Sequence, residues 1–280
     1  MKKILSILLC VILAFSSFAV IAFAEEESVD YVVLGDSIAF GAGMVNTVEA
    51  CYGKIVADTN GYNYVNYSIP GITSGVLLTM LTDGENIRAS VEEAEIISIS
   101  IGGNNFLTNN IVGLAFDCLV KKDLSSFDKI ADVFYDEFCA IMDEINKLNP
   151  DAAVLIQTLY NPQDGAAGIV YADGGNRLND MIRKYDAEHP GEIVIVEVGA
   201  ALNSDRENFA DDKIHPSAKG NEVIAVEVLS VLCELGLGEN TEPVILNEGL
   251  DFLMPVSYAI IVNLVCSIFE GLGNIVNPIG

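Results

Sequence analysis

The stretch that decides the fold is Val32-Val33-Leu34-Gly35-Asp36-Ser37, near the start of the chain. A short run of branched apolar residues ends there in a glycine, a carboxylate and a hydroxyl, which is typical of a buried strand that stops at a sharp turn. Similar runs rich in Val, Ile or Tyr recur along the chain. The expected strands are Tyr31–Leu34, Tyr62–Tyr67, Ile96–Ile101, Ala153–Thr158 and Ile193–Val198.

Helical patterns separate these strands. They are expected over Val48–Asp58, Thr73–Leu81, Lys129–Leu148, Gly175–Ala187 and Ser217–Leu235. Such alternation predicts a parallel sheet with helices on both faces, because parallel strands need crossover connections that cover the sheet. The expected fold class is therefore α/β, with three layers in the order αβα around a five-stranded parallel sheet.

The two ends of the chain differ from this middle part. Lys2 and Lys3 precede an apolar run that ends in Ala22-Phe23-Ala24, which predicts a signal peptide over 1–24, although the run is also long enough for an uncleaved membrane anchor. We expect one domain over 29–237 and an apolar tail over 238–280. The protein is therefore expected to be secreted or extracytoplasmic, with a possible association with a membrane.

The apolar tail carries a single charge between Phe252 and Gly280, at Glu270. Polar residues recur there at helical spacing as a narrow stripe. A helix of this kind is expected to pack on the domain, or to contact a membrane or a protein partner through residues 252–280. A membrane span is disfavoured because Lys and Arg do not flank the segment.

Charge and cysteine content exclude some classes of partner and leave one question open. The chain has 14 basic and 40 acidic residues, a formal net charge of −26. A surface this negative repels phosphate backbones, so nucleic acid is excluded as a partner, and tight docking on anionic lipid is disfavoured.

If Cys10 leaves with the signal peptide, an odd number of cysteines remains, and the sequence leaves their pairing open: Cys51, Cys118, Cys139, Cys233 and Cys266.

A serine and a histidine near opposite ends of the predicted domain supply the parts needed for nucleophilic catalysis. Ser37 follows the first strand, and His215 has the carboxylate of Asp212 three residues before it. A histidine can take the proton of a serine hydroxyl, and a carboxylate can orient that histidine. Asp212 is favoured for this role, and Asp211 stays an alternative. The other histidine, His189, lies in a polar turn and is expected to have a structural or solvated role.

Further polar groups follow the neighbouring strands. Gly71 comes a few residues after the second strand, and Asn104 follows the third. Because ligands bind at the carboxyl ends of strands in open parallel sheets, we expect these residues to converge with Ser37. Asp36 is expected to accept hydrogen bonds from backbone N–H groups at the start of the following helical segment.

Four short blocks of the chain resemble those of the GDSL, or SGNH, hydrolase family, in that family's order and spacing. The blocks are Gly35-Asp36-Ser37 followed by Gly41-Ala42-Gly43, then Asn66-Tyr67-Ser68-Ile69-Pro70-Gly71-Ile72-Thr73-Ser74, then Gly102-Gly103-Asn104, and finally Asp212-Lys213-Ile214-His215-Pro216. The resemblance covers residues 29–237 and implies a flavodoxin-like sheet. One departure is Asn105, where the family commonly has an aspartate that supports the loop.

This resemblance implies an exported serine esterase or acylhydrolase. Ser37, His215 and Asp212 would be the catalytic triad, and Ser37, Gly71 and Asn104 would supply an oxyanion hole. The implied substrate is a small-molecule, carbohydrate or lipid ester. Gly41 and Gly43 do not fit a dinucleotide-binding loop, and the two histidines are distant in sequence, so no cofactor and no metal are expected. The alternative is a non-catalytic, surface-associated binding module on the same fold.

The insertion at Phe106–Phe138 follows the third block and is expected to influence the choice of substrate. Its apolar stretch at residues 111–116 predicts either a core helix or a lid over an acyl pocket. The sequence leaves both possibilities open.

Overall fold

The structure, a computed structural model, describes residues 31–253, 264 and 267–274, so the predicted signal peptide, Cys10 and Cys266 lie outside the described residues. One five-stranded sheet runs in the order β2-β1-β3-β4-β5, and all neighbouring strands are parallel. Its strands are β1 Tyr31–Gly35, β2 Tyr64–Asn66, β3 Ile96–Ser100, β4 Ala153–Gln157 and β5 Val194–Val196. This is the flavodoxin-like order, and it confirms the expected α/β fold.

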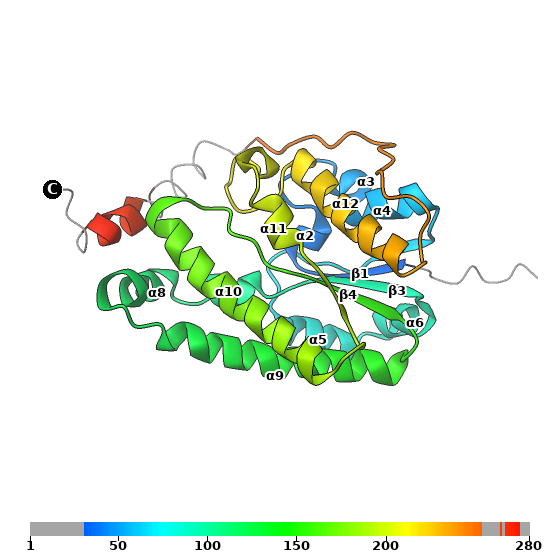
Figure 1. Ribbon diagram of the computed structural model, residues 1–280, viewed down its shortest axis with the longest axis horizontal. Helices are drawn as coiled ribbons and strands as arrows, with labels where there is room; N and C mark the ends of the chain where they lie inside the picture. Colours follow the sequence, from blue (N-terminus) through cyan, green and yellow to red (C-terminus); the bar gives the residue numbers. More distant parts are fainter. Residues whose placement is uncertain (1–30, 254–263, 265–266, 275–280) are drawn as a thin grey trace, which may run out of the picture.

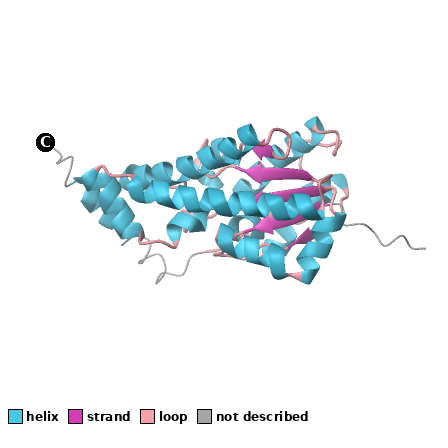
Figure 2. Ribbon diagram, turned by 90° about the horizontal axis from the view of Figure 1, so that it is seen from below, coloured by secondary structure: helices cyan, strands magenta, loops and turns pink. Residues whose placement is uncertain are grey.

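Helices cover both faces of the sheet, with α5 and α9 on one side and α4 and α12 on the other (Figure 1). Beyond the strand ends on one side, the helical part of the molecule continues as an extension (Figure 2). The helices are α2 Ser37–Phe40, α3 Thr47–Ala50, α4 Tyr52–Asn60, α5 Ser74–Asp83, α6 Glu85–Glu93, α7 Gly103–Leu107, α8 Ile111–Phe116, the π-helix η1 Asp117–Lys121, α9 Ser125–Leu148, α10 Gly165–Glu188, α11 Val198–Leu202, the 3₁₀ turn η2 Arg206–Asn208 and α12 Ala218–Glu234.

The central strand β1 shows how the sequence produces two cores. Val32 and Leu34 pack in the core under α5, α9 and α10, whereas Tyr31 and Val33 pack under α4 and α12. Successive side chains of a strand point to opposite faces, so a strand that is covered on both faces is apolar throughout. All four side chains are fully buried, which explains the uninterrupted apolar run.

Two of the predicted helices differ most from the structure. The helix expected over Val48–Asp58 is interrupted at Cys51, whose extended backbone (φ −66°, ψ 156°) separates α3 from α4. The interruption lets the backbone N–H of Tyr52, at the start of α4, donate to Oδ1 of Asn221 at 3.1 Å. Because Asn221 belongs to α12, far along the chain, the sequence around Cys51 does not indicate this contact.

The helix expected over Gly175–Ala187 begins at Gly165 instead. Glycines at its start lower the helix propensity, so the local pattern underestimates the helix. Tertiary packing explains two of them. A Cβ at Gly174 would lie 3.2 Å from the ring of Phe127, and one at Gly168 would lie 2.7 Å from the carbonyl oxygen of Gln163. The prediction also lacked α6, and it extended β2 and β5 beyond their observed ends.

The described part of the tail lies against the domain. Phe269 is only 1% exposed and belongs to the core that α9 and α10 share. Its neighbour Glu270 accepts a hydrogen bond from the backbone N–H of Ala166 at 3.1 Å, at the N-terminus of α10. A carboxylate is favourable at this position because the first N–H groups of a helix have no partner within it. Within the described residues, no helix is both long and apolar enough to cross a bilayer.

Candidate active site

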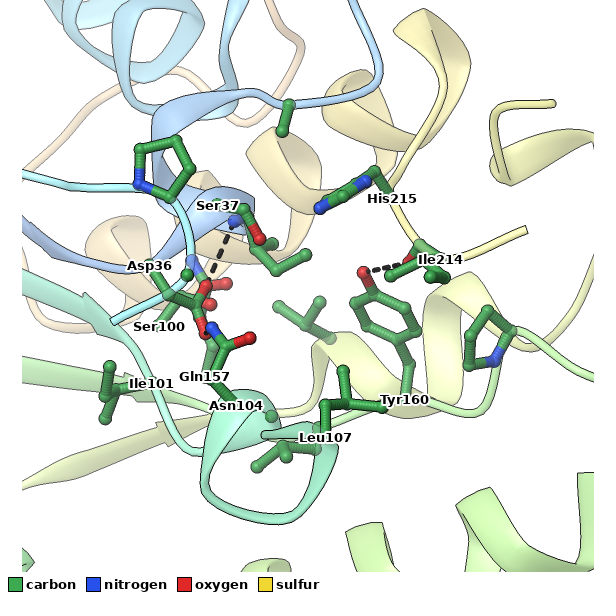
Figure 3. A pocket seen from close by; sticks show the side chains of 18 of the residues that line it. Asp36, Ser37, Ser100, Ile101, Asn104, Leu107, Gln157, Tyr160, Ile214 and His215 are labelled. Carbon is green, nitrogen blue, oxygen red and sulfur yellow. Dashed lines mark hydrogen bonds between the residues drawn. The ribbon is translucent and has the colours of Figure 1, made fainter. Parts of the chain in front are cut away.

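A cavity of about 410 Å³ lies at the carboxyl ends of the central strands. Ser37 and His215 lie at one side of it, and Asn104 and Tyr160 lie across from them (Figure 3). The structure thus brings together side chains from the loops after β1, β3, β4 and β5. Gly71, from the loop after β2, also lines the cavity.

The turn that carries Ser37 depends on its two neighbours. Gly35 has φ +137°, and a Cβ there would lie 2.0 Å from the carbonyl oxygen of Ser100, so only glycine allows β1 to approach β3 at this point. Asp36 accepts a hydrogen bond from the backbone N–H of Ile38 at 3.0 Å, which confirms its expected capping role. Ser37 then begins α2 with its hydroxyl directed toward the cavity (Figure 3).

His215 lies in a turn that Asp212 organises. Nδ1 of the His215 ring is 2.5 Å from Oδ2 of Asp212, while Oδ1 of Asp212 accepts hydrogen bonds from the backbone N–H groups of Ile214 and His215, both at 2.9 Å. Burial opposes ionisation of Asp212, but the histidine and these N–H groups outweigh it and hold its pKa below the usual value. The alternative carboxylate, Asp211, is exposed and lines a different cavity.

The opposite nitrogen of the His215 ring faces Ser37 across the edge of the cavity (Figure 3). The side chain of His215 is 21% exposed and that of Asp212 is 14% exposed, so the pair is shielded but the ring remains reachable. Carboxylate, imidazole and hydroxyl therefore follow one another in the order that activates a serine.

Asn104 connects three of the loops. Its amide Nδ2 donates to the carbonyl oxygen of Ile72 at 3.0 Å and lies 3.4 Å from Oδ2 of Asp36. Ile72 follows Gly71, which has φ +87° and occupies the third position of a tight turn after Pro70. Gly71 therefore meets a turn requirement and also lines the cavity.

Asn105 stabilises this loop. It stands at the position where the GDSL family commonly has an aspartate. Its side chain accepts a hydrogen bond from the backbone N–H of Ser74 at 3.1 Å and donates to the Ser74 hydroxyl at 2.6 Å. The Ser74 hydroxyl in turn donates to Glu137 of α9. A carboxylate is thus still present in this network, supplied by another helix.

Asp36, directly before Ser37, is a buried carboxyl group, only 3% exposed. Burial raises its pKa to about 6, against the opposing effects of the Ile38 N–H group and the charge of His215. Because the folded-state value exceeds the usual 3.8, the folded state binds this proton more tightly than the unfolded state does. The ionised form therefore destabilises the fold, increasingly as pH rises from about 4 to about 6.

Asp36→Asn is expected to stabilise the fold at high pH, since the amide keeps an acceptor for the Ile38 N–H group and removes the buried charge. The free energy of unfolding should rise by up to about 3 kcal/mol at pH 8, and by less than about 1 kcal/mol near pH 4. Urea unfolding at both pH values measures this difference. Asp211→Asn is the exposed control, and an equal gain for Asp36→Asn at both pH values would contradict the assignment.

Two residues of the loop after β4 hold the turn that carries His215, and sequence reasoning missed both. The Tyr160 hydroxyl donates to the carbonyl oxygen of Ile214 at 2.7 Å, and the Gln163 amide donates to the carbonyl oxygen of Lys213. Lys213 has φ +56°, an unusual conformation for a residue with a side chain, so the turn needs outside support. The only local signal was a polar segment after a buried strand.

The hydroxyl of Tyr160 stays protonated, and is thus a donor, over a wide pH range. Burial, together with the nearby carboxylates of Asp36 and Asp212, raises the pKa of Tyr160 well above its usual value. The ring packs against Phe209 at 5.4 Å between centroids. Removal of the hydroxyl alone should therefore leave the ring in its position.

Tyr160→Phe is expected to lower kcat for a simple ester about tenfold with KM changed less than about threefold, because the His215 turn loses one anchor but the cavity keeps its shape. Steady-state kinetics with p-nitrophenyl butyrate measure both constants. Tyr135→Phe is the matched control, since it removes a hydroxyl that bonds Glu188 on the surface. Equal kcat for the two variants would rule out a positioning role for Tyr160.

The remaining walls of the cavity are largely apolar. Phe106 and Leu107 of α7 and Tyr171 of α10 line one side. In α8, which follows, Leu114 and Ala115 are buried whereas Val112 and Phe116 are 42% and 40% exposed. The stretch at residues 111–116 is thus a helix that packs one face on the core and presents the other to solvent.

Other candidate groups lie away from this cavity. His189 ends α10, stacks on Tyr185 at 4.3 Å between ring centroids and pairs with Glu192. In the described ranges, no group of three or more His, Cys, Asp or Glu side chains gathers in the way a metal site requires. The cysteines that the structure describes are free: Cys51, Cys118, Cys139 and Cys233.

Comparison with known proteins agrees with this geometry. The model of the GDSL-like Lipase/Acylhydrolase family matches residues 33–223. The uncharacterized protein YpmR of Bacillus subtilis (strain 168) is 24% identical over 224 residues, which span 76% of this chain and 84% of YpmR.

Solved structures of lipases share the fold at lower identity. The lipase Lip_vut3 from a goat rumen metagenome matches with a TM-score of 0.60 and 20% identity, over 76% of this chain and 99% of the lipase. An extracellular lipase from Streptomyces rimosus matches with a TM-score of 0.57 and 17% identity, over 73% of this chain and 99% of that chain.

Proposed function

Since the chain belongs to the GDSL-like lipase/acylhydrolase family, a family of hydrolases, we propose that it is an exported serine esterase that cleaves carboxylic esters through an acyl-enzyme. The observation that carries the proposal is the 2.5 Å contact between Asp212 and His215, whose ring lines the same cavity as Ser37. The expected signal peptide at residues 1–24 would direct export and be removed from the mature protein. We also propose that residues 29–237 form the catalytic domain.

In the proposed mechanism the Ser37 hydroxyl attacks the ester carbonyl carbon while His215 takes its proton. Asp212 keeps the ring in the tautomer that leaves the opposite nitrogen free to accept, and stabilises the imidazolium that forms. The lowered pKa of Asp212 supports this role, because the carboxylate stays ionised at mildly acidic pH. His215 then gives the proton to the leaving alcohol, and water hydrolyses the acyl-enzyme by the same route in reverse order.

The oxyanion of the tetrahedral intermediate needs hydrogen-bond donors. We assign this role to the backbone N–H groups of Ser37 and Gly71 and to the amide of Asn104. One Asn104 proton is held by the carbonyl of Ile72 at 3.0 Å, whereas the 3.4 Å separation from Asp36 is long for a hydrogen bond. The second N–H group, with only this long contact to Asp36, is therefore the one that would donate a hydrogen bond to a bound substrate oxygen.

The shape of the cavity supports an ester with an apolar acyl group of limited length. Phe106, Leu107 and Tyr171 offer apolar surface on the side of α7 and α10, within a total volume of about 410 Å³. Apolar groups gain free energy in proportion to the area that they bury there. Short to medium acyl chains should therefore bind better than acetyl.

The test is a chain-length series on the mature protein. Hydrolysis of p-nitrophenyl acetate, butyrate and octanoate should give the highest kcat/KM for butyrate or octanoate. A best rate with acetate would contradict the acyl-pocket assignment while leaving the esterase proposal intact. Absence of turnover for all three esters, with rates equal to those of an Asn104→Ala variant, would favour a non-catalytic binding module.

A further inference from the structure

The chain that follows α12 returns to the edge of the sheet that carries the cavity. It lies outside the family match at residues 33–223, and Figure 1 draws it as the orange coil along the upper edge of the molecule. Residues 249–252, here called the strap, contact two of the loops that form the candidate site. One loop follows the helix of Ser37, and the other follows His215.

The strap pairs with the chain that follows α2. The backbone N–H of Val45 donates to the carbonyl oxygen of Leu250 at 2.7 Å, and the N–H of Phe252 donates to the carbonyl oxygen of Gly43 at 2.8 Å. Between these bonds, Asp251 forms an antiparallel bridge with Met44. The strap thus adds a short two-stranded pairing to the segment directly after the nucleophile.

The side chain of Asp251 contacts the segment after His215. Its Oδ1 accepts a hydrogen bond from the backbone N–H of Ala218 at 2.7 Å, at the first residue of α12. Ser217 caps the same helix by accepting from the N–H of Gly220 at 3.1 Å. Asp251 therefore satisfies a second N–H group that the helix itself leaves without a partner, at the end where negative charge is favourable.

The two segments that the strap joins touch each other beside the histidine. Gly43 has φ +107°, and a Cβ there would lie 2.4 Å from the carbonyl oxygen of Pro216 and 3.1 Å from Cβ of His215. Displacement of either segment would therefore change the position of His215 relative to Ser37. Asp251 bonds to one segment through its side chain, and its neighbours Leu250 and Phe252 bond to the other segment through their backbones.

We propose that Asp251 is a positioning residue, which holds the segments after Ser37 and His215 in register and so sets the geometry of the proposed nucleophile and base. The inference rests on the proposed esterase function for its catalytic consequence. It gives the segment after α12 a role in the chemistry of the domain, in addition to any role of the apolar residues beyond it.

The test uses the full mature chain with two Asp251 variants and one control. Asp251→Ala removes the acceptor for the Ala218 N–H group, whereas Asp251→Asn keeps an acceptor oxygen and removes only the charge. Glu248→Ala is the matched control, because Glu248 is exposed and acidic like Asp251 and lies on the same segment, but the hydrogen bond that it accepts, from Asn46, goes to its backbone carbonyl. Asp251→Ala should lower kcat for p-nitrophenyl butyrate about tenfold with KM nearly unchanged, Asp251→Asn by less than about threefold, and Glu248→Ala not at all.

A second readout does not depend on turnover. The chain contains two histidines, so the ring Cε1–H resonances in an NMR spectrum can be assigned with His189→Gln. Asp251→Ala should shift the His215 resonance and leave that of His189 in place, because the surroundings of His189 are Tyr185 and Glu192, which the strap does not contact in the described residues. Equal kcat and unchanged His215 resonance in Asp251→Ala and Glu248→Ala would overturn the proposal.

The remaining outcomes separate this inference from the proposed function. A shift of the His215 resonance in a protein that hydrolyses no ester would support the positioning role and reject the esterase. A loss of kcat that accompanies unfolding, with an unchanged His215 resonance in the folded fraction, would show a merely structural role and reject the positioning role.

Discussion

Ser37→Ala is expected to lower kcat for p-nitrophenyl butyrate by at least about 10⁴-fold, because the variant has no hydroxyl that can form the acyl-enzyme. The effect should fall on kcat, since the walls of the cavity do not depend on this hydroxyl. Alanine also suits the first position of α2, so the fold should be retained. Steady-state kinetics and thermal unfolding of the same preparation measure both consequences.

The control for this variant is Ser204→Ala, which removes an exposed serine hydroxyl from another turn. Its kcat should equal that of the unmodified protein. If Ser37→Ala retained more than about one hundredth of the original kcat, a nucleophilic role for Ser37 would be untenable.

Asp212→Asn is expected to lower kcat by about 10⁴-fold at neutral pH, although the side chain keeps its shape. The asparagine oxygen can still accept the backbone N–H groups of Ile214 and His215, so the turn should persist. Its amide group, however, donates toward Nδ1 of His215 and so favours the tautomer whose other nitrogen already carries a proton. Such a ring cannot accept a proton from Ser37.

The pH profile adds a separate check on Asp212. Because its pKa lies below the usual value, Asp212 stays ionised as pH falls toward 5, so a loss of activity there in the unmodified protein must come from another group. Asp211→Asn, one residue away and exposed, should match the unmodified protein at every pH. A larger loss with Asp211→Asn than with Asp212→Asn would assign the orienting role to Asp211.

The candidate site was largely predictable from the sequence because its members follow strands. Ser37, Gly71 and Asn104 come soon after β1, β2 and β3, and a parallel sheet brings these points to one edge. The pairing of Asp212 with His215 was predictable because a separation of three residues closes within one turn. The catalytic roles of these residues stay predictions until the variants are measured.

The supporting contacts were not predictable, since they join segments far apart in the sequence. Tyr160 reaches Ile214 across 54 positions, and Asp251 reaches Ala218 across 33. Neither residue belongs to a pattern of periodicity or spacing. Only the fold brings each beside the backbone group that it bonds.

Helix limits were predicted less well than strands, for a similar reason. Gly165 and the glycines after it have low helix propensity, yet α10 includes them because close packing against Phe127 and the 160–164 loop favours small residues. The break at Cys51 coincides with a hydrogen bond from the next residue, Tyr52, to Asn221 of α12. In both cases tertiary contacts outweigh local preference.

The central claim is that the Ser37 hydroxyl is the activated nucleophile of a Ser-His-Asp arrangement. The most direct measurement is covalent labelling of the mature chain with a fluorophosphonate, followed by mass spectrometry of the proteolysed protein. The account predicts one adduct per chain, on Ser37, formed rapidly in the unmodified protein and at least about 100-fold more slowly in Asp212→Asn. A stoichiometric adduct on any other residue, or equal labelling of Ser37→Ala, would contradict it.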